Sequence, residues 1–209
     1  MINSKKVILI SLFLIATVMA GGAAETLKDT INQLDSAGRK HGYWKKTVKD
    51  TLVYEGRFVH GKPVGFFTYY RGNGKVKSTV VYADSGFTAR TVMYHENGKV
   101  MAIGKYSDRR KDSVWRYYTS KEMLIIKETY KNGVLHGEMV GYFEDGKPYE
   151  SIEYRNNSME GEWKQFYRSG KLKLKGTLKA GKLTGLFNIF HENGAVAVLV
   201  EKELVGCSV

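Results

Sequence analysis

The stretch Gly65-Phe-Phe-Thr-Tyr-Tyr-Arg-Gly-Asn-Gly-Lys-Val-Lys-Ser-Thr-Val-Val-Tyr82 decides the fold of this chain. Its centre, Asn73-Gly74, is a strong turn dipeptide, because tight turns need residues that accept a positive φ. After the turn, Val76, Val80 and Tyr82 share one face of an extended segment, and such period-two alternation is typical of a strand with one buried face. The stretch therefore predicts a β-hairpin.

The same pattern returns at a fixed spacing of 24 residues along the chain. Its opening residue is glycine except at Ala89 and Ser113, and its second aromatic position is filled in every copy. A looser first copy, which begins at Gly42, is one residue shorter and lacks the central Asn-Gly type of turn. A strict period of this length predicts a repeat architecture, which favours an extended surface over a single catalytic pocket.

The residues expected to hold the hairpins together are the opening glycines and the recurring rings. They are Gly65, Trp115, Tyr118, Gly137, Tyr142, Gly161, Trp163, Phe166, Gly185 and Phe190. The two ring positions of a unit lie three residues apart, so a flat strand would place them on opposite faces. Either a bulge or the use of rings on both faces resolves this, and the pattern alone does not choose.

The fold class that these features predict is all-β: an elongated antiparallel meander of about seven β-hairpins over residues 38–206. Links such as Lys131-Asn132-Gly133 join consecutive units. The chain has only two prolines, Pro63 and Pro148, as expected of a long sheet, because proline cannot donate to the ladder of hydrogen bonds.

The N-terminus has the pattern of a secretory signal. Lys5 and Lys6 precede the apolar run Val7–Met19, which is short for a membrane span. We expect residues 1–20 to be a signal peptide cleaved after Ala20, or after Ala24, and an uncleaved membrane anchor is the alternative. Localisation is then periplasmic, extracellular or at the cell envelope.

Residues 25–37 differ from the repeats. Leu27, Ile31 and Leu34 follow helical spacing, and Gly38 is a plausible stop, so we expect a short helix that caps the first strand. A disordered stub is the alternative. Cys207 is the only cysteine, and it therefore forms no internal disulfide.

The formal net charge is +12, and lysines gather near the turns. A basic balance can favour anionic membrane or cell-wall surfaces. Lysine on exposed strands also serves solubility and deters pairing at sheet edges, and this interpretation has more weight. We do not expect nucleic acid as a partner.

The sequence carries no recognisable catalytic, cofactor-binding or metal-binding motif. The five histidines follow the repeat: His95 and His191 both precede Glu-Asn-Gly, and His41, His60 and His136 adjoin linker glycines. We therefore expect turn or strand-end roles for them and no enzyme activity, cofactor or metal.

The unit Gly-x-Trp-x-x-aromatic-x-x-x-Gly-Lys, seen from Gly161 to Lys171, resembles the MORN-repeat variant of bacterial proteins, often called the YwqK-type antitoxin family. The resemblance extends over about residues 38–206. It implies an array of β-hairpins used for binding, with a toxin-like protein partner. The function we expect is non-enzymatic binding of a protein partner outside the cytoplasm. The alternatives are attachment to an anionic membrane or envelope surface, and an enzyme whose site breaks the repeat.

Overall fold

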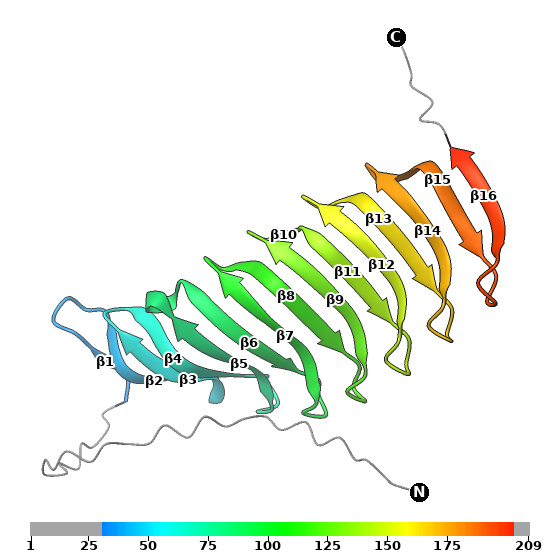
Figure 1. Cartoon of the computed structure of the whole chain (residues 1–209). Helices are drawn as coiled ribbons and strands as arrows, with labels where there is room; N and C mark the ends of the chain where they lie inside the picture. The colour runs from blue at the N-terminus through cyan, green and yellow to red at the C-terminus, as the bar shows by residue number, and fades with distance from the viewer. Residues whose placement is uncertain (1–30, 203–209) are drawn as a thin grey trace, which may run out of the picture.

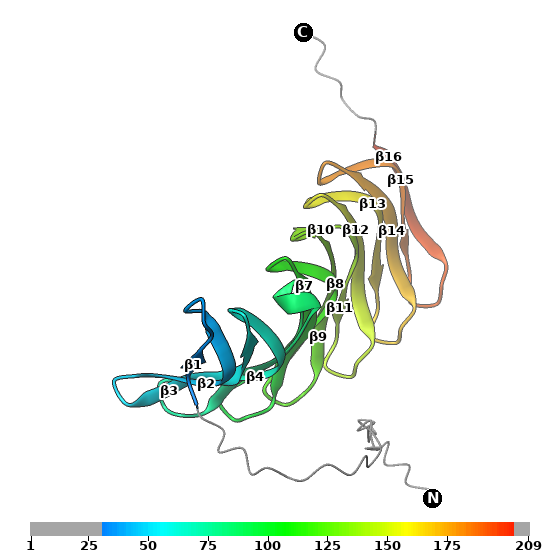
Figure 2. The same cartoon turned by 90° about the vertical axis from the view of Figure 1, so that its left-hand side faces the viewer.

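The computed structural model describes residues 31–202 as one extended antiparallel sheet of 16 strands (Figure 1). The strands are curved, and the sheet twists along its length (Figure 2). Their bounds are β1 Gln33–Leu34, β2 Lys40–Val48, β3 Thr51–Val59, β4 Lys62–Tyr70, β5 Val76–Ala83, β6 Thr88–Tyr94, β7 Val100–Ser107, β8 Arg110–Tyr118, β9 Leu124–Lys131, β10 Val134–Leu135, β11 Gly137–Tyr142, β12 Pro148–Arg155, β13 Ser158–Phe166, β14 Leu172–Lys179, β15 Lys182–Phe190 and β16 Val196–Lys202.

Apart from β10 and β11, which both pair with β9, each strand pairs with its neighbour in the chain, so the predicted antiparallel meander is confirmed. Strands β2 to β16 form seven hairpins, with β10 and β11 together acting as the first strand of the fifth. No α-helix occurs among residues 31–202, where the only helical segment is a short 3-10 turn at Asp84–Gly86. No helix in this part of the chain has the length and apolar content needed to cross a membrane.

The turns of the repeated hairpins share one hydrogen-bonding scheme. In the first, Arg71 N donates to Lys75 O at 2.8 Å and Gly74 N donates to Arg71 O at 3.0 Å. Gly74 has a φ of 79°, a conformation that favours glycine, and Asn73 Oδ1 accepts a bond from Lys75 N at 3.1 Å. The Asn-Gly signal in the sequence therefore marks the turn correctly.

The spacing of the two rings in each unit is resolved by the use of both faces, and a bulge occurs in the partner strand and not in the strand that carries the rings. Tyr69 pairs with Ser78 but Tyr70 pairs with Val76, so β5 bulges at Lys77. The rings also lie on both faces: Phe67 packs against Tyr69, whereas Tyr70 Oη on the other face donates to Glu55 Oε1 at 2.5 Å. Equivalent register shifts precede Tyr94, Tyr118, Tyr142, Phe166 and Phe190.

One face of the sheet carries most of the apolar contacts, and we call it the ring face. Its rings include Trp44, Tyr54, Phe58, Phe67, Tyr69, Tyr82, Tyr106, Trp115, Tyr117, Tyr130 and Trp163. Phe67 and Trp115 are the largest fully buried side chains, each 1% exposed. The opposite face carries ion pairs such as Lys105–Asp112 and Lys127–Glu138. The ring face therefore acts as the core of a sheet that has only one layer.

The predicted capping helix is wrong over residues 31–37. Gln33 and Leu34 form β1, which pairs with β2, and the chain then turns at Asp35. The Asp35 carboxylate accepts hydrogen bonds from Ala37 N and Arg39 N, which stabilises a turn instead of a helix. The remainder of that helix (25–30), the signal peptide (1–20) and Cys207 lie outside the described residues.

Candidate functional site

The third hairpin, β6 and β7, departs from the repeat and borders a cavity. In most units the opening residue has a positive φ, for example 67° at Gly65 and 114° at Gly161. At this position the first strand of the hairpin contains extra residues. Gly56 and Arg57 are consecutive in β3, but their partners in β4, Phe67 and Val64, are three residues apart. Around Ala89, by contrast, β5 and β6 pair without any shift in register.

This hairpin lacks the extra residues of the bulge, and the link before it is longer by the same number. That link spans residues 84–87, whereas the other links between hairpins are two residues long. It contains three consecutive positive-φ residues, Asp84, Ser85 and Gly86. The period of 24 is thus kept by moving two residues from the bulge to the link.

The second departure is the absence of a ring. Thr91 occupies the position that Phe67 and Trp115 hold in the two neighbouring hairpins. The result is a cavity of about 340 Å³, lined mainly by apolar atoms. Its lining residues are Tyr69, Lys77, Ser78, Val80, Tyr82, Gly86, Phe87, Ala89, Thr91, Met93, Tyr106 and Arg109.

The polar groups of the cavity differ in how well they are satisfied. Tyr69 Oη and Tyr82 Oη form a hydrogen bond of 2.8 Å with each other. Burial raises the pKa of Tyr69 and of Tyr106. Thr91 is 4% exposed, and its Oγ1 has no hydrogen-bond partner. A buried hydroxyl without a partner is costly, and Thr91 is the one polar residue among the described residues that is almost fully buried.

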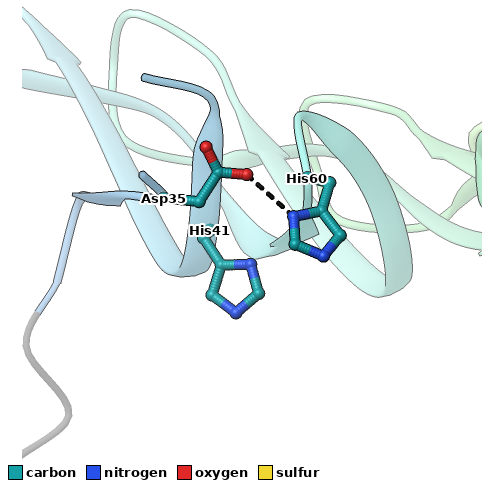
Figure 3. Close-up of side chains that lie close together, drawn as sticks. All are labelled: Asp35, His41 and His60. Carbon is teal, nitrogen blue, oxygen red and sulfur yellow. Dashed lines mark hydrogen bonds and ion pairs between the residues drawn. The ribbon is translucent and has the colours of Figure 1, made fainter. Parts of the chain in front are cut away.

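A second cluster joins Asp35, His41 and His60 at the first hairpin (Figure 3). Asp35 Oδ2 lies 2.8 Å from His60 Nδ1, and this hydrogen bond is the main reason why the pKa of Asp35 is lowered. Arg39 Nε donates to the same carboxylate oxygen at 2.9 Å, and its Nη2 lies 3.1 Å from His60 Nδ1. The guanidinium therefore contacts two of the three groups that a metal ion would need, and its ion pair with Asp35 holds the first turn together.

The remaining histidines follow the turns, as predicted. His95 Nε2 donates to Tyr118 O at 2.9 Å, and so joins its own turn to the next. The turn lysines do the same: Lys75 Nζ donates to Glu96 O at 2.9 Å and Lys147 Nζ donates to Arg168 O at 3.0 Å. These contacts give the lysine positions a structural role between units.

The predicted repeat residues occupy structural positions but are not equally buried. Gly137 and Gly185 have positive φ values like those of Gly65 and Gly161. Trp115 is buried, whereas its equivalent Trp163 is only half-buried and donates through Nε1 to Glu150 Oε1 at 2.9 Å. The later rings Tyr118, Tyr142, Phe166 and Phe190 are half-buried.

Sequence reasoning missed both the cavity and the cluster. Ala89 and Thr91 stood out as departures from the repeat, and that was the available signal for the cavity. His41 and His60 flank one hairpin, so its register places them together, with their ring centroids 5.2 Å apart. Asp35 was missed because a helix was predicted over it.

The fold and these sites define a class: a β-hairpin repeat protein built from one sheet. Comparison with known families adds that residues 89–108, 135–156 and 159–180 match the MORN repeat variant. These segments contain most of the third, fifth and sixth hairpins, and the first of them forms part of the cavity. The chain therefore carries MORN-type repeats.

No curated protein matches the chain. Among solved structures, the crystal structure of TarM is 15% identical, with a TM-score of 0.26 over 47% of this chain and 17% of that one. A mutant of S. aureus TarM in complex with fondaparinux, alpha-GlcNAc-glycerol and UDP is 13% identical, with a TM-score of 0.28 over 57% of this chain and 19% of that one. The chain thus spans less than a fifth of the length of either structure.

Proposed function

We propose that this protein is a non-enzymatic binding module that holds a protein partner on the ring face of its sheet. The observation that carries the proposal is that no second layer covers this face among residues 31–202, so its half-buried rings, such as Tyr54, Tyr69 and Tyr117, remain partly accessible around the buried Phe67 and Trp115. Tyrosine, tryptophan and phenylalanine are enriched at protein interfaces, and tyrosine and tryptophan dominate the energetics of binding.

The shape of the array supports the same role. Each hairpin contacts mainly its two neighbours, so the sheet presents one long surface instead of a compact core. The lysines on which attachment to an anionic surface would depend are partly used between units, as Lys75 and Lys147 show. A protein partner on the ring face is therefore the function that the geometry favours.

The identity of the partner and its compartment are also proposals. The resemblance to the YwqK-type antitoxin family favours a toxin-like protein, and the apolar run Val7–Met19 favours export to the periplasm or cell envelope. N-terminal sequencing of protein from the native host tests export: the expected first residue is Gly21 or Glu25, and an intact Met1 in the cytosolic fraction contradicts it.

Site-specific photocrosslinking tests the binding face. Gln165 and Lys164 are adjacent in β13, and they project from opposite faces because side chains alternate along a strand. We replace each in turn by p-benzoylphenylalanine in the native host. The Gln165 position should give a discrete crosslinked protein, which mass spectrometry identifies, and the Lys164 position should not. Equal crosslinking from both faces, or from neither, contradicts the proposal.

A further inference from the structure

We propose that the Thr91 cavity binds a tyrosine side chain of the protein partner, presented next to a carboxylate. This inference rests on the proposed function, since it names the part of the partner that the ring face recognises. Three independent features of the cavity lead to it: the rings on either side, the unpartnered hydroxyl and the charges at the mouth.

The first feature is the arrangement of the flanking rings. On one side, Tyr82 packs edge-on against Phe67, with ring centroids 5.0 Å apart and an interplanar angle of 83°. On the other side, Tyr106 packs edge-on against Trp115 at 4.9 Å and 73°. Both tyrosines also line the cavity, where Thr91 stands in place of a ring. An aromatic ring from a partner would therefore continue the row with the edge-to-face contacts that aromatic pairs prefer.

The second feature selects a ring with a polar atom. Thr91 Oγ1 is buried and has no hydrogen-bond partner, and the residue lines the cavity. A hydroxyl can donate or accept, and so can a phenol. A tyrosine ring, unlike phenylalanine, offers this atom a partner when the Thr91 side chain rotates to turn its hydroxyl toward the cavity, while the ring fills the apolar space around Val80 and Ala89.

The third feature selects a carboxylate beside the ring. Lys77 and Arg109 line the cavity and are exposed, and none of the described residues that line it is acidic. Arginine pairs well with carboxylates through its planar fork of donors. The exposed Phe87 on the long link also borders the cavity and supplies an apolar edge for the partner's backbone.

Peptide probes test each feature separately on the full chain. The main probe is acetyl-Gly-Tyr-Asp-Gly-amide, and binding is followed by NMR chemical-shift changes of the labelled protein. Replacing its tyrosine by phenylalanine should weaken binding roughly fivefold, the effect of one hydrogen bond. Replacing its aspartate by asparagine should also weaken binding, and added salt should reduce the difference. Free tyrosine that binds as tightly as the peptide contradicts the assignment to a protein partner.

Matched variants locate the site. Thr91→Phe supplies the ring that position 67 holds in the preceding hairpin, so it should abolish probe binding. Met139→Phe makes the same change at the equivalent position of the fifth hairpin, outside the cavity, and should leave binding unchanged. Arg109→Gln changes an exposed side chain and should remove the preference of the protein for the aspartate peptide over the asparagine peptide. This variant tests the site independently if Thr91→Phe does not fold.

The outcomes separate this inference from the proposed function. If the probe does not bind, or binds Thr91→Phe as well as wild type, the cavity assignment is overturned. If a partner protein is still crosslinked from the Gln165 position in that case, the proposed binding function stands without the tyrosine site. If the probe binds as expected but no protein is crosslinked from the ring face, the proposed function fails while the tyrosine site stands.

Discussion

The indole ring of Trp115 lies directly over Gly104, so close that a Cβ built on that glycine would be 2.1 Å from the ring. The same relationship holds in the first two hairpins, where Phe67 covers Gly56 at 2.4 Å. A glycine beneath an aromatic ring on the next strand is therefore a repeated device of this sheet. It lets one layer bury large rings fully, because the ring rests on the backbone instead of on a second layer.

Replacing Gly104 by alanine should destabilise the protein by about 1–3 kcal/mol, because the added methyl group displaces the Trp115 ring from its contacts. The measurement is the free energy of unfolding from urea titration. Gly72→Ala is the matched control, since a Cβ there meets nothing within 4 Å and the φ is not positive. Equal midpoints for the two variants would show that the close approach has no energetic role.

The two equivalent tryptophans should differ in their contributions. Trp115→Ala should cost about 3–5 kcal/mol, because the ring is 1% exposed and leaves a cavity over Gly104. Trp163→Ala should cost clearly less, because that ring is half-buried. Denaturant melts of both variants give the comparison, and a larger loss at Trp163 would contradict the burial argument.

These tryptophans show how far the sequence predicts this fold. The period of 24, the Asn-Gly turns and the alternation after them were sufficient for the hairpins, their number and their order. Each of these signals is local, and a repeat propagates it. The sequence could not separate Trp115 from Trp163, because their burial depends on residues opposite them: Trp115 covers Gly104, whereas Trp163 bonds to Glu150.

The candidate site was less accessible to sequence reasoning. Thr91 and Ala89 were visible as irregular positions, but the sequence does not reveal that β5 and β6 pair in register while the link at 84–87 absorbs the extra residues. That exchange leaves the period intact, so it is hidden in the sequence. The helix predicted over residues 25–37 is wrong in its described part, residues 31–37: the apolar spacing was helical, but the Asp35 side chain stabilises a turn.

Alkaline pH should weaken the protein through Tyr43. Burial, with a hydrogen bond to Glu55, raises the pKa of Tyr43 to about 12, above the unfolded value of about 10. Because the folded state keeps the phenol neutral, its contribution is complete below the unfolded pKa and is lost as the pH rises through 12. The free energy of unfolding of wild type should therefore fall more steeply over this window than that of Tyr43→Phe. Parallel curves would contradict the shifted pKa.

The turn histidines should separate in the same way as the tryptophans. His95→Ala should cost about 1 kcal/mol, because it removes the partly buried hydrogen bond to Tyr118 O. His191→Ala, at the equivalent position, should change stability by less than about 0.5 kcal/mol because that side chain is exposed. Thermal melts test the pair, and neither variant should alter probe binding at the Thr91 cavity.

Deleting residues 137–160 removes one whole unit and should leave a folded array of six hairpins. Gly137 and Gly161 are equivalent, and both have a positive φ. After the deletion, Gly161 follows His136 and takes the place that Gly137 holds in the full chain. Two strands at about 4.8 Å each leave the sheet, so small-angle scattering should show a particle shorter by roughly 10 Å. Deleting residues 149–160 is the control: it removes half a unit, reverses the direction of every later strand and should unfold that part. Loss of structure after the full-unit deletion would contradict the equivalence of the repeats, since each hairpin would then depend on more than its neighbours.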